Sequence, residues 1–366
     1  MNPVDQLMEK GVRDGVFPGA ALLLSRGGDI LHRAIYGNAA LEPERVGMRF
    51  GTLFDVASLS KVMATTAIAM RLQEAGRLEL DVELASLLPV FKESAYRAVT
   101  VEHLLAHTAG LPAYVPYFQR FGVTEVEDLP RDEVQARLLE WIAQETPLGA
   151  AGAERVYSDL DFIILGALLE KVGGESLRDL FRREVAAPLE LHQTLYSPVD
   201  RSRREAGRVA ATEKDPWRGR LLCGEVDDQN AYLLGGVAGH AGIFTSVDDC
   251  HKFACELLRS VRGDSSWLRA ETVGLFIGSD RRRTLGWDRP SQPTSQAGRY
   301  IHASAWGHLG FTGCSLWIEP DRELIVILFS NRVHPTRSND LIKAFRPLIH
   351  DAVFQHYVGA DDESAK

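Results

Sequence analysis

The sequence contains little cysteine and no long apolar run. Its four cysteines form no C-x-x-C pair and are too few for a disulfide framework, so we expect reduced thiols in a cytoplasmic protein. The opening stretch, MNPVDQLMEKGVRDGVFPG, has scattered charges and lacks the apolar core of a secretion signal. No segment reaches the roughly 18 apolar residues of a membrane-spanning helix, which argues against a membrane span.

The chain also lacks an excess of positive charge. Its 41 basic and 50 acidic residues give a net charge of −9, the wrong sign for a surface that neutralises phosphates, so nucleic acid is not an expected partner. Hydrophobic residues make up 45% and charged residues 25% of the chain, as in ordinary globular proteins. At 366 residues the chain exceeds the usual single-domain size, and we expect two lobes with room for a buried site.

Strand patterns cluster at the two ends of the chain. The stretch GAALLLSRGGDILHRAIYG predicts a hairpin with a glycine turn, and CSLWIEPDRELIVILFSNR predicts a second hairpin that turns at residues 320–322. Helical patterns cover residues 3–15, most of 78–258, and 338–357. The simplest assembly is an α/β (α+β) fold, in which the hairpins pair in one antiparallel sheet flanked by helices, with an inserted, mainly α-helical lobe.

This pattern also divides the chain. We expect residues 1–77 and 265–358 to form the sheet lobe, 78–264 the helical lobe, and 359–366 a frayed, disordered tail. A helix over residues 58–75, apolar on nearly all sides, should be central to the fold and end at Gly76, where glycine can adopt the left-handed cap. Together with the two terminal helices, it would cover the sheet.

A serine and a lysine open this central helix, in FDVASLSKVMATTAIAM. Because they are three residues apart, Ser58 and Lys61 share one helix face, and the amine can reach the serine hydroxyl and take its proton. Burial and the positive end of the helix dipole both favour the neutral amine. The alternative is that Ser58 caps the helix and Lys61 extends to solvent. Since chance yields roughly one S-x-x-K in a chain this long, the motif needs support.

Two further stretches supply that support. ERVYSDLDF places Tyr157 just before an apolar helix, and WGHLGFTGCSLWIEP places His308 ahead of a strand. A serine acyl-enzyme needs a nucleophile, a base that returns the proton to the leaving group, and donors for the oxyanion. Ser58, the Lys61/Tyr157 pair and a glycine-flanked strand edge supply all three. Taken alone, Tyr157 would more often be a core residue with its hydroxyl outward.

With these motifs in order, the sequence resembles the serine β-lactamase and penicillin-binding-protein superfamily, specifically the class C β-lactamase-like hydrolases and esterases. The match runs from about Phe17 to Asn331 and includes VFPGAALLL, FDVASLSK, TVEHLLAHTAGLP, VYSDLDFIILG, GGVAGHAGIFTS and GHLGFTGCSLWIEP. The resemblance implies a β-lactamase/transpeptidase-like fold and a serine hydrolase that uses no metal and no cofactor.

The resemblance also implies roles for individual residues. Ser58 attacks the carbonyl and is acylated, while Lys61 keeps the site basic. Tyr157, as a tyrosinate, relays the proton to the leaving group and then activates the deacylating water. The backbone N–H groups of Ser58 and Phe311 form the oxyanion hole, since Phe311 follows the triplet that ends at Gly310 on the edge strand.

Two positions depart from the family pattern. Asp159 stands where the Y-x-N form has asparagine, and His308 begins a triplet, ending at Gly310, that replaces K-T-G. These residues put a carboxylate and a mostly neutral imidazole near the substrate. We therefore expect a bound carboxylate to be disfavoured relative to a neutral ester. This puts β-lactamase activity in doubt and leaves the acyl-enzyme machinery intact.

Three other histidines are candidates for different roles. His103 and His107 in HLLAH have the spacing of a zinc site, but the glutamate of H-E-x-x-H is missing and the helix ends at once. A structural role beside the cleft is favoured for this pair. His240, ringed by glycines in GVAGHAG, is a candidate for a substrate contact, although a lone histidine in a loop is usually structural.

Three functions are compatible with these residues. The leading hypothesis is a carboxylesterase-type serine hydrolase acting on small esters or amides. The second is a β-lactamase or D-amino peptide hydrolase, similar to a D-Ala-D-Ala carboxypeptidase, acting on cell-wall fragments. The third is a catalytically silent penicillin-binding or regulatory protein, since fold alone does not give function. The expected partner is a small-molecule ester, amide or β-lactam.

Overall fold

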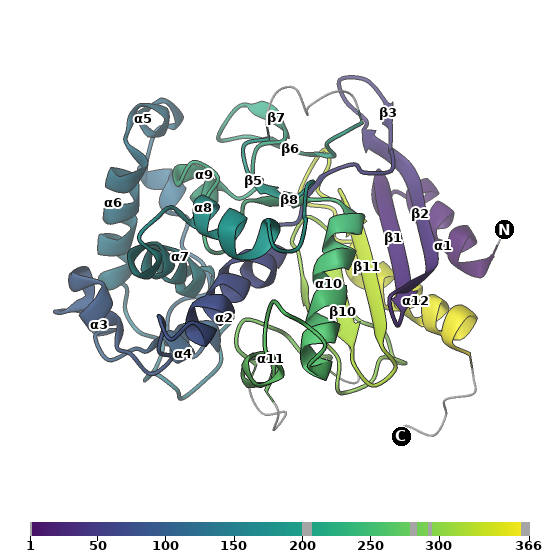
Figure 1. Ribbon diagram of the computed structural model, residues 1–366. Coiled ribbons are helices and arrows are strands. Elements are labelled where there is room, and N and C mark those ends of the chain that lie inside the picture. Colours follow the sequence, from purple (N-terminus) through teal and green to yellow (C-terminus); the bar gives the residue numbers. More distant parts are fainter. Residues whose placement is uncertain (1, 200–206, 279–283, 292–294, 360–366) are drawn as a thin grey trace.

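The centre of the molecule is an antiparallel sheet that joins the two ends of the chain. The computed structural model describes residues 2–199, 207–278, 284–291 and 295–359 (Figure 1). The main sheet has the strand order β3-β2-β1-β11-β10-β9. The bounds are β1 Gly19–Arg26, β2 Asp29–Ala40, β3 Val46–Gly47, β9 Trp306–Leu309, β10 Ser315–Glu319 and β11 Leu324–Ser330. The pairing of β1 with β11 confirms the single sheet predicted from the two hairpins.

Both predicted hairpins are present. β1 and β2 are joined at Gly27 and Gly28, whose φ angles of 59° and 92° lie in the left-handed region that favours glycine. β10 and β11 are joined by the turn that follows Glu319. The register of β1 against β11 runs from Ala20 opposite Ser330 to Arg26 opposite Leu324. The chain ends are thus hydrogen-bonded together along nearly the whole of β1.

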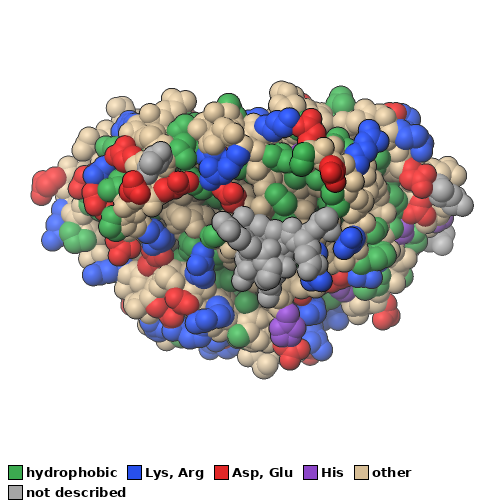
Figure 2. Space-filling model, turned by 90° about the horizontal axis from the view of Figure 1, so that it is seen from above, with side chains coloured by type: hydrophobic (Ala, Val, Ile, Leu, Met, Phe, Trp, Pro, Cys, Tyr) green, Lys and Arg blue, Asp and Glu red, His purple; other side chains and the backbone are tan. Residues whose placement is uncertain are grey.

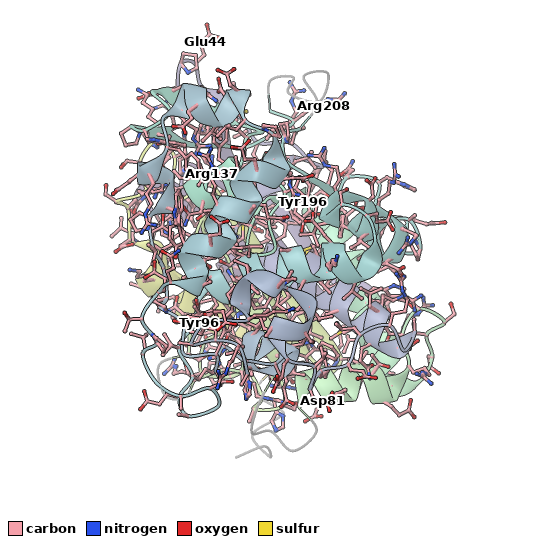
Figure 3. All side chains as sticks on the ribbon, turned by 90° about the vertical axis from the view of Figure 1, so that its left-hand side faces the viewer. Glu44, Asp81, Tyr96, Arg137, Tyr196 and Arg208 are labelled. Atoms are coloured by element: carbon pink, nitrogen blue, oxygen red, sulfur yellow. The ribbon has the colours of Figure 1, made fainter. Side chains whose placement is uncertain are left out.

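Helices cover the sheet and build the rest of the molecule. Those against the sheet are α1 Pro3–Arg13, α10 Val247–Arg262 and α12 Ile342–Val353 with its π-helical extension η6 Phe354–Val358. α2 Ala67–Glu74, the helix after Ser58, was expected to cover the sheet, but it packs against other helices to the left of α10 in Figure 1, and α10 takes its place on the sheet. Those to the left of the sheet in Figure 1 are α3 Leu84–Leu87, α4 Val101–Leu105, α5 Val123–Asp128, α6 Arg131–Ala143, α7 Asp159–Gly173, α8 Leu177–Phe181 and α9 Gln229–Leu233. The other helical elements are α11 Ala270–Ile277 and the short η2 Pro89–Phe91, η3 Tyr117–Arg120 and η4 Arg182–Ala186. Figure 3 looks onto the helical end, where Arg137 of α6 lies.

The sheet lies between two hydrophobic cores. Ala20, Leu22 and Leu24 of β1 belong to the core that includes side chains of α1 and α12. Ala21 and Leu23 belong to the other core, which includes side chains of α2 and α10. Because successive side chains of a strand point to opposite faces, a strand covered on both sides is apolar at every position. This explains the uninterrupted apolar run in the first predicted hairpin.

The lobe boundaries remain a prediction. α10, which the boundary at residue 264 assigns to the helical lobe, packs against β1 and β11. Its buried side chains include Cys250, Phe253, Ala254 and Leu257, which recur at helical spacing along one face. We therefore propose that α10 belongs with the sheet lobe and that the helical lobe ends before it.

The helix after Ser58 begins with a π-helical segment. η1 (Lys61–Thr66) continues directly as α2, and each of its residues is buried. This burial agrees with a helix that is apolar on nearly all sides. The helix ends at Glu74 with Ala75 as its cap, and Gly76 has the positive φ of 66° expected from its place after the last turn. Such π-helical turns are frequent at functional sites.

Short strands interrupt the middle of the chain. β4 Phe54–Asp55, β8 Ile243–Thr245 and β5 Leu195–Tyr196 pair in that order, and β6 Ala211–Asp215 pairs with β7 Arg220–Cys223. The sequence pattern does not predict these strands, because segments of two to five residues are too short to show a period of two. β4 is important for the site, since it leads directly to Ser58.

The surface has a mixed charge on the face that Figure 2 shows, where acidic and basic side chains lie among each other. In the described ranges, no helix combines the length and the apolar character needed to cross a membrane. The predicted tail lies outside the described residues from position 360 onward.

We expect Leu23→Ala to destabilise the fold strongly. Leu23 is fully buried in β1, opposite Ile327 of β11, and truncating a buried leucine costs about 2–5 kcal/mol of the free energy of unfolding. The control is Leu31→Ala on β2, where the side chain is 39% exposed and a change of about 0.5 kcal/mol or less is expected. Urea unfolding followed by circular dichroism measures both, and equal losses would contradict this account of the core.

Candidate active site

A strained turn presents Ser58 at the start of the central helix. Ala57, the preceding residue, has a φ of 47°, which is uncommon for a residue with a Cβ atom. Oδ1 of Asp55 accepts a hydrogen bond from the Ala57 N–H at 2.9 Å and so holds the turn. Its Oδ2 accepts from the N–H of Asp227 at 2.6 Å, which ties the turn to a distant loop. Ser58 stays partly exposed although its neighbours on both sides are buried.

Ser58 opens into a cleft of about 780 Å³. The predicted site residues that line this cleft are Ser58, Tyr157, Asp159, His308, Gly310 and Phe311. The remaining predicted residue, Lys61, is fully buried and donates a hydrogen bond to Ser58 Oγ at 3.0 Å. The structure therefore brings all of the predicted site residues together, from the central helix, the start of α7 and the end of β9.

The ammonium group of Lys61 has three hydrogen-bond acceptors. Besides Ser58, its Nζ donates to Oδ1 of Asp159 at 2.6 Å and to the backbone oxygen of His240 at 3.3 Å. A lysine ammonium has three donors and no acceptor, so this arrangement suits the charged form. Burial by itself lowers the pKa of Lys61, but the Asp159 carboxylate and Tyr157 raise it more, and the pKa lies above its ordinary value.

The neutral amine expected from the sequence is therefore wrong for the resting site. That expectation considered burial and the helix dipole, which both act against the charge. It omitted the carboxylate of Asp159, which lies 98 positions further along the chain and forms the ion pair. The same pair changes the interpretation of Asp159, whose negative charge is compensated by Lys61 and does not face the substrate alone.

Tyr157 lies beside the buried ammonium. The centroid of its ring is 4.9 Å from Lys61 Nζ, and 36% of the residue is exposed. Its hydroxyl interacts with Ser58 and Lys61. Burial raises the pKa of Tyr157, and the opposing effect of Lys61 is smaller, so the pKa stays above its ordinary value. The tyrosinate implied by the family resemblance is thus not the resting form, which is a neutral phenol.

His107 supports Tyr157 from behind. The two ring centroids are 4.7 Å apart, and His107 Nδ1 lies 2.9 Å from Oδ2 of Asp161. Both side chains of this pair are buried, and burial lowers the pKa of His107 well below its usual value. His103 belongs to a different network, because its Nδ1 accepts from the N–H of Thr100 at the start of α4. The two histidines of HLLAH thus serve separate contacts.

The end of β9 forms the opposite wall of the cleft. His308 Nδ1 donates to the backbone oxygen of Leu309 at 2.8 Å, which leaves Nε2 as an unprotonated acceptor that has no hydrogen-bond partner among the described residues and lies 3.9 Å from Oδ2 of Asp288. Burial lowers the pKa of His308, so its imidazole is neutral, in agreement with the expectation from the sequence. A Cβ atom on Gly310 would lie 2.4 Å from the backbone oxygen of Val56. Only glycine lets this strand edge approach the Ser58 turn so closely.

The cleft also holds His240, the histidine predicted as a candidate for a substrate contact, together with residues that the sequence analysis did not single out. Nε2 of His240 lies 2.8 Å from Oδ1 of Asp228, and both residues line the cleft beside Ser58. Burial by itself would raise the pKa of Asp228, but the charge and the hydrogen bond of His240 lower it to about 2. Tyr114, Arg337 and Arg346 also line the cleft. No motif marks these residues in the sequence, because each is an isolated polar residue in a loop or helix.

Over residues 4–349 the chain matches the protein-family model described as Beta-lactamase. The chain belongs to the beta-lactamase family. As the match spans nearly the whole chain, it covers Ser58, Tyr157 and the end of β9 together. The family assignment agrees with the resemblance inferred from the motifs.

The curated relatives of the chain include an amidase and a carboxypeptidase by name. The chain is 29% identical to an "N-acetylmuramyl-L-alanine amidase" of Bacillus subtilis (strain 168), covering 91% of this chain and 81% of the relative. It is 28% identical to a "Putative D-alanyl-D-alanine carboxypeptidase" of Escherichia coli (strain K12), covering 91% of this chain and 82% of the relative. Both relatives therefore align with this chain over most of both lengths.

Solved structures of the same fold include a hydrolase and a class C beta-lactamase. "EstCE1, a hydrolase with promiscuous acyltransferase activity" superposes with a TM-score of 0.73 at 24% identity, covering 96% of this chain and 97% of that one. "A class C beta-lactamase" superposes with a TM-score of 0.71 at 20% identity, covering 95% and 94%. At these identities the likeness confirms the β-lactamase-type fold alone.

We expect Asp159→Asn to shift the pH profile of this beta-lactamase family member toward lower pH. The Asp159 carboxylate raises the pKa of both Lys61 and Tyr157, so its removal makes either group easier to deprotonate. If catalysis needs a deprotonated base, kcat/KM for an activated ester should rise with pH at a lower midpoint in the variant than in the wild type.

The matched control is Asp288→Asn. Asp288 also lines the cleft, where its carboxylate pairs with Arg155 at 2.6 Å and lies 3.9 Å from His308 Nε2. Because the pKa shifts of Lys61 and Tyr157 come from Asp159 and not from Asp288, we expect the midpoint to stay unchanged. An Asp159→Asn variant that loses activity at every pH, with its midpoint unmoved, would instead make Asp159 itself the proton acceptor.

Proposed function

We propose that this chain is a serine hydrolase that forms an acyl-enzyme on Ser58 and cleaves small esters or amides in the manner of a carboxylesterase. The observation that carries the proposal is the partly exposed Ser58 hydroxyl, hydrogen-bonded to a buried Lys61 at 3.0 Å and next to Tyr157. A serine is activated by a base within hydrogen-bond reach that is itself oriented by a third group. Asp159 is the orienting group in this arrangement.

Acylation requires the site to lose a proton first. In the resting state Lys61 is an ammonium and Tyr157 a phenol, so neither can accept the Ser58 proton. The active form is the one in which the Lys61/Tyr157 pair has given up one proton to solvent. The pair then takes the hydroxyl proton as Ser58 Oγ bonds to the substrate carbonyl, and it returns this proton to the leaving group as the acyl-enzyme forms.

The oxyanion of the tetrahedral intermediate needs donors that are not already used. Among the described residues, the backbone N–H groups of Ser58 and Phe311 have no hydrogen-bond acceptor. Both residues line the cleft, and the tight approach of Gly310 to Val56 brings their segments together. We assign these two N–H groups to the oxyanion hole. Deacylation repeats the cycle, with water in place of Ser58 and the Lys61/Tyr157 pair as base.

The neutral imidazole of His308 supports a substrate that is uncharged where it meets this wall of the cleft. It supplies an acceptor where many relatives have a lysine, so a carboxylate at that point gains no charge-assisted hydrogen bond. The sequence analysis also expected the negative charge of Asp159 to repel a substrate carboxylate. This repulsion is weaker than expected, because Lys61 compensates the charge of Asp159. The class C-like placement and the cytoplasmic location remain predictions.

A second candidate is the hydrolysis of amide bonds in cell-wall peptides. It is favoured by the names of the Bacillus subtilis and Escherichia coli relatives, each of which aligns over 91% of this chain. An amide differs from an ester in needing its leaving nitrogen protonated, which the same Lys61/Tyr157 pair can do. The chemistry at Ser58 is shared, and the two candidates differ in the substrate.

Ser58→Ala should abolish covalent labelling and ester hydrolysis together. Removing the nucleophile is expected to lower kcat for p-nitrophenyl butyrate by about three orders of magnitude or more. Labelling with a fluorophosphonate, followed by mass spectrometry of the labelled peptide, locates the adduct. The control is Ser86→Ala, an exposed serine of α3, which should keep full labelling. A wild-type protein that forms no adduct and hydrolyses no ester would support the catalytically silent alternative.

The comparison of substrates separates the candidates. We expect kcat/KM to be highest for p-nitrophenyl butyrate and lower by about tenfold or more for nitrocefin, because His308 offers no cation to the lactam carboxylate. An N-acyl-D-alanyl-D-alanine peptide, assayed by release of D-alanine, provides the third value. Efficient turnover of the peptide or of nitrocefin with poor ester turnover would overturn the esterase assignment and favour the second candidate.

A further inference from the structure

Arg346 is a buried cation in the wall of the cleft. It lies on α12 and is only 4% exposed. Its Nη1 donates to Oε1 of Gln296 at 3.2 Å, and its Nη2 donates weakly to the backbone oxygen of Cys314 at 3.5 Å. Nε has no partner among the described residues. Buried charges in proteins are normally paired with an opposite charge, so this guanidinium lacks the anion that its burial calls for.

The other charged side chains of the cleft already have partners. The basic groups that line it pair as follows: Arg332 with Asp340, Arg337 with Glu213, and Lys343 with Asp340. The acidic groups pair as follows: Asp159 with Lys61, Asp227 with Arg337, Asp228 with His240, and Asp288 with Arg155. Within the described lining, Arg346 is thus the basic residue without an acidic side chain within 4.0 Å.

Arg346 keeps its charge in this position. Burial lowers the pKa of Arg346 to about 10, which still leaves it protonated at neutral pH. The neighbouring thiol cannot act as the counter-ion, because burial raises the pKa of Cys314 to about 12. His350, one turn further along α12, is neutral as well, since burial lowers its pKa to about 3. The positive charge at this wall is therefore uncompensated by its surroundings.

Arg346 also lies close to the proposed oxyanion hole. The backbone oxygen of Cys314 accepts hydrogen bonds both from Arg346 Nη2 and from the N–H of Gly310, the latter at 2.7 Å. Gly310 directly precedes Phe311, whose N–H is one of the two proposed oxyanion donors. A single carbonyl therefore connects the guanidinium to the strand edge where the scissile bond would lie. The guanidinium of Arg346 therefore meets the segment 308–310 at Gly310, whereas His308 stands at its other end.

We propose that Arg346 binds an anionic group, a carboxylate, on the substrate that acylates Ser58. This inference rests on the proposed hydrolase function and narrows its substrate class to esters or amides that carry a carboxylate away from the scissile carbonyl. A guanidinium with unused N–H groups in a site of low dielectric is a strong donor to a carboxylate. Bound substrate supplies the counter-charge that the fold omits, and the neutral His308 wall accommodates the uncharged part.

The test uses two esters of equal length that differ in one charge. p-Nitrophenyl valerate ends in a methyl group, and mono-p-nitrophenyl glutarate ends in a carboxylate. The measured quantity is the ratio of kcat/KM for the glutarate ester to kcat/KM for the valerate ester. We expect Arg346→Gln to lower this ratio by about tenfold or more, and Arg346→Lys, which keeps the charge, to recover part of the loss.

Lys10→Gln is the control for charge. Lys10 lies on α1, which packs against α12, but it is largely exposed, pairs with Asp14 and does not line the cleft. Its loss removes one positive charge outside the cleft, and we expect the ratio to change by less than about twofold. Equal changes of the ratio in the two variants would indicate a long-range effect of net charge. An unchanged ratio in Arg346→Gln would indicate that Arg346 has a structural role and does not bind the substrate. Either result overturns the proposal.

A binding measurement separates this inference from the proposed function. In the Ser58→Ala background, where no chemistry occurs, glutarate should raise the melting temperature, and the additional Arg346→Gln change should remove this effect. No shift with glutarate overturns the anion site even if both esters are hydrolysed. A shift without any ester hydrolysis or fluorophosphonate labelling by the wild type leaves the anion site standing and overturns the hydrolase proposal.

Discussion

A buried ammonium group holds the candidate site together. The three acceptors around Lys61 Nζ come from three segments of the chain: Ser58 beside it, Asp159 at the start of α7, and the backbone of His240 in the loop before β8. Removing such a cation from water is costly unless its donors are used and its charge is opposed. The Lys61–Asp159 pair meets both needs. The orientation of the Ser58 hydroxyl, the protonation of Tyr157 and the course of the glycine-rich loop around His240 all depend on this pair.

Features encoded by neighbouring residues could be predicted from the sequence. Alternation and turn residues mark both hairpins, and the three-residue spacing of Ser58 and Lys61 places them on one helix face, where a hydrogen bond joins them. Gly310, which ends the triplet that begins at His308, has no room for a side chain because it lies against the backbone oxygen of Val56. This position must therefore be glycine, and the glycine makes the motif recognisable in the sequence. The family motifs then brought residues from distant parts of the chain to one site before their contacts were known.

Features that depend on charges far apart in the sequence could not be predicted. The pKa of Lys61 is raised by Asp159, and that of Tyr157 is raised by burial first and by Asp159 to a smaller extent. A single position with aspartate instead of asparagine gives no hint of which group it faces. Arg346 lacks an ion-pair partner because the acidic side chains that line the cleft already pair with other basic residues. This is a property of the whole cleft and cannot be seen in the sequence around Arg346. Strands as short as β4 and β5 escape the sequence pattern for a different reason, since they show no period at all.

The placement of β11 between β1 and β10 has a consequence for how the protein is made. β1 and β2 are synthesised early, yet the strand that pairs with the other edge of β1 comes from residues 324–330. Until these residues leave the ribosome, the main sheet remains a hairpin with an open edge, and β9 has no route to its place beside the Ser58 turn. Sheets built from such distant segments close late in folding. A prematurely terminated chain would therefore carry the nucleophile and the buried lysine without the strand edge that completes their cleft.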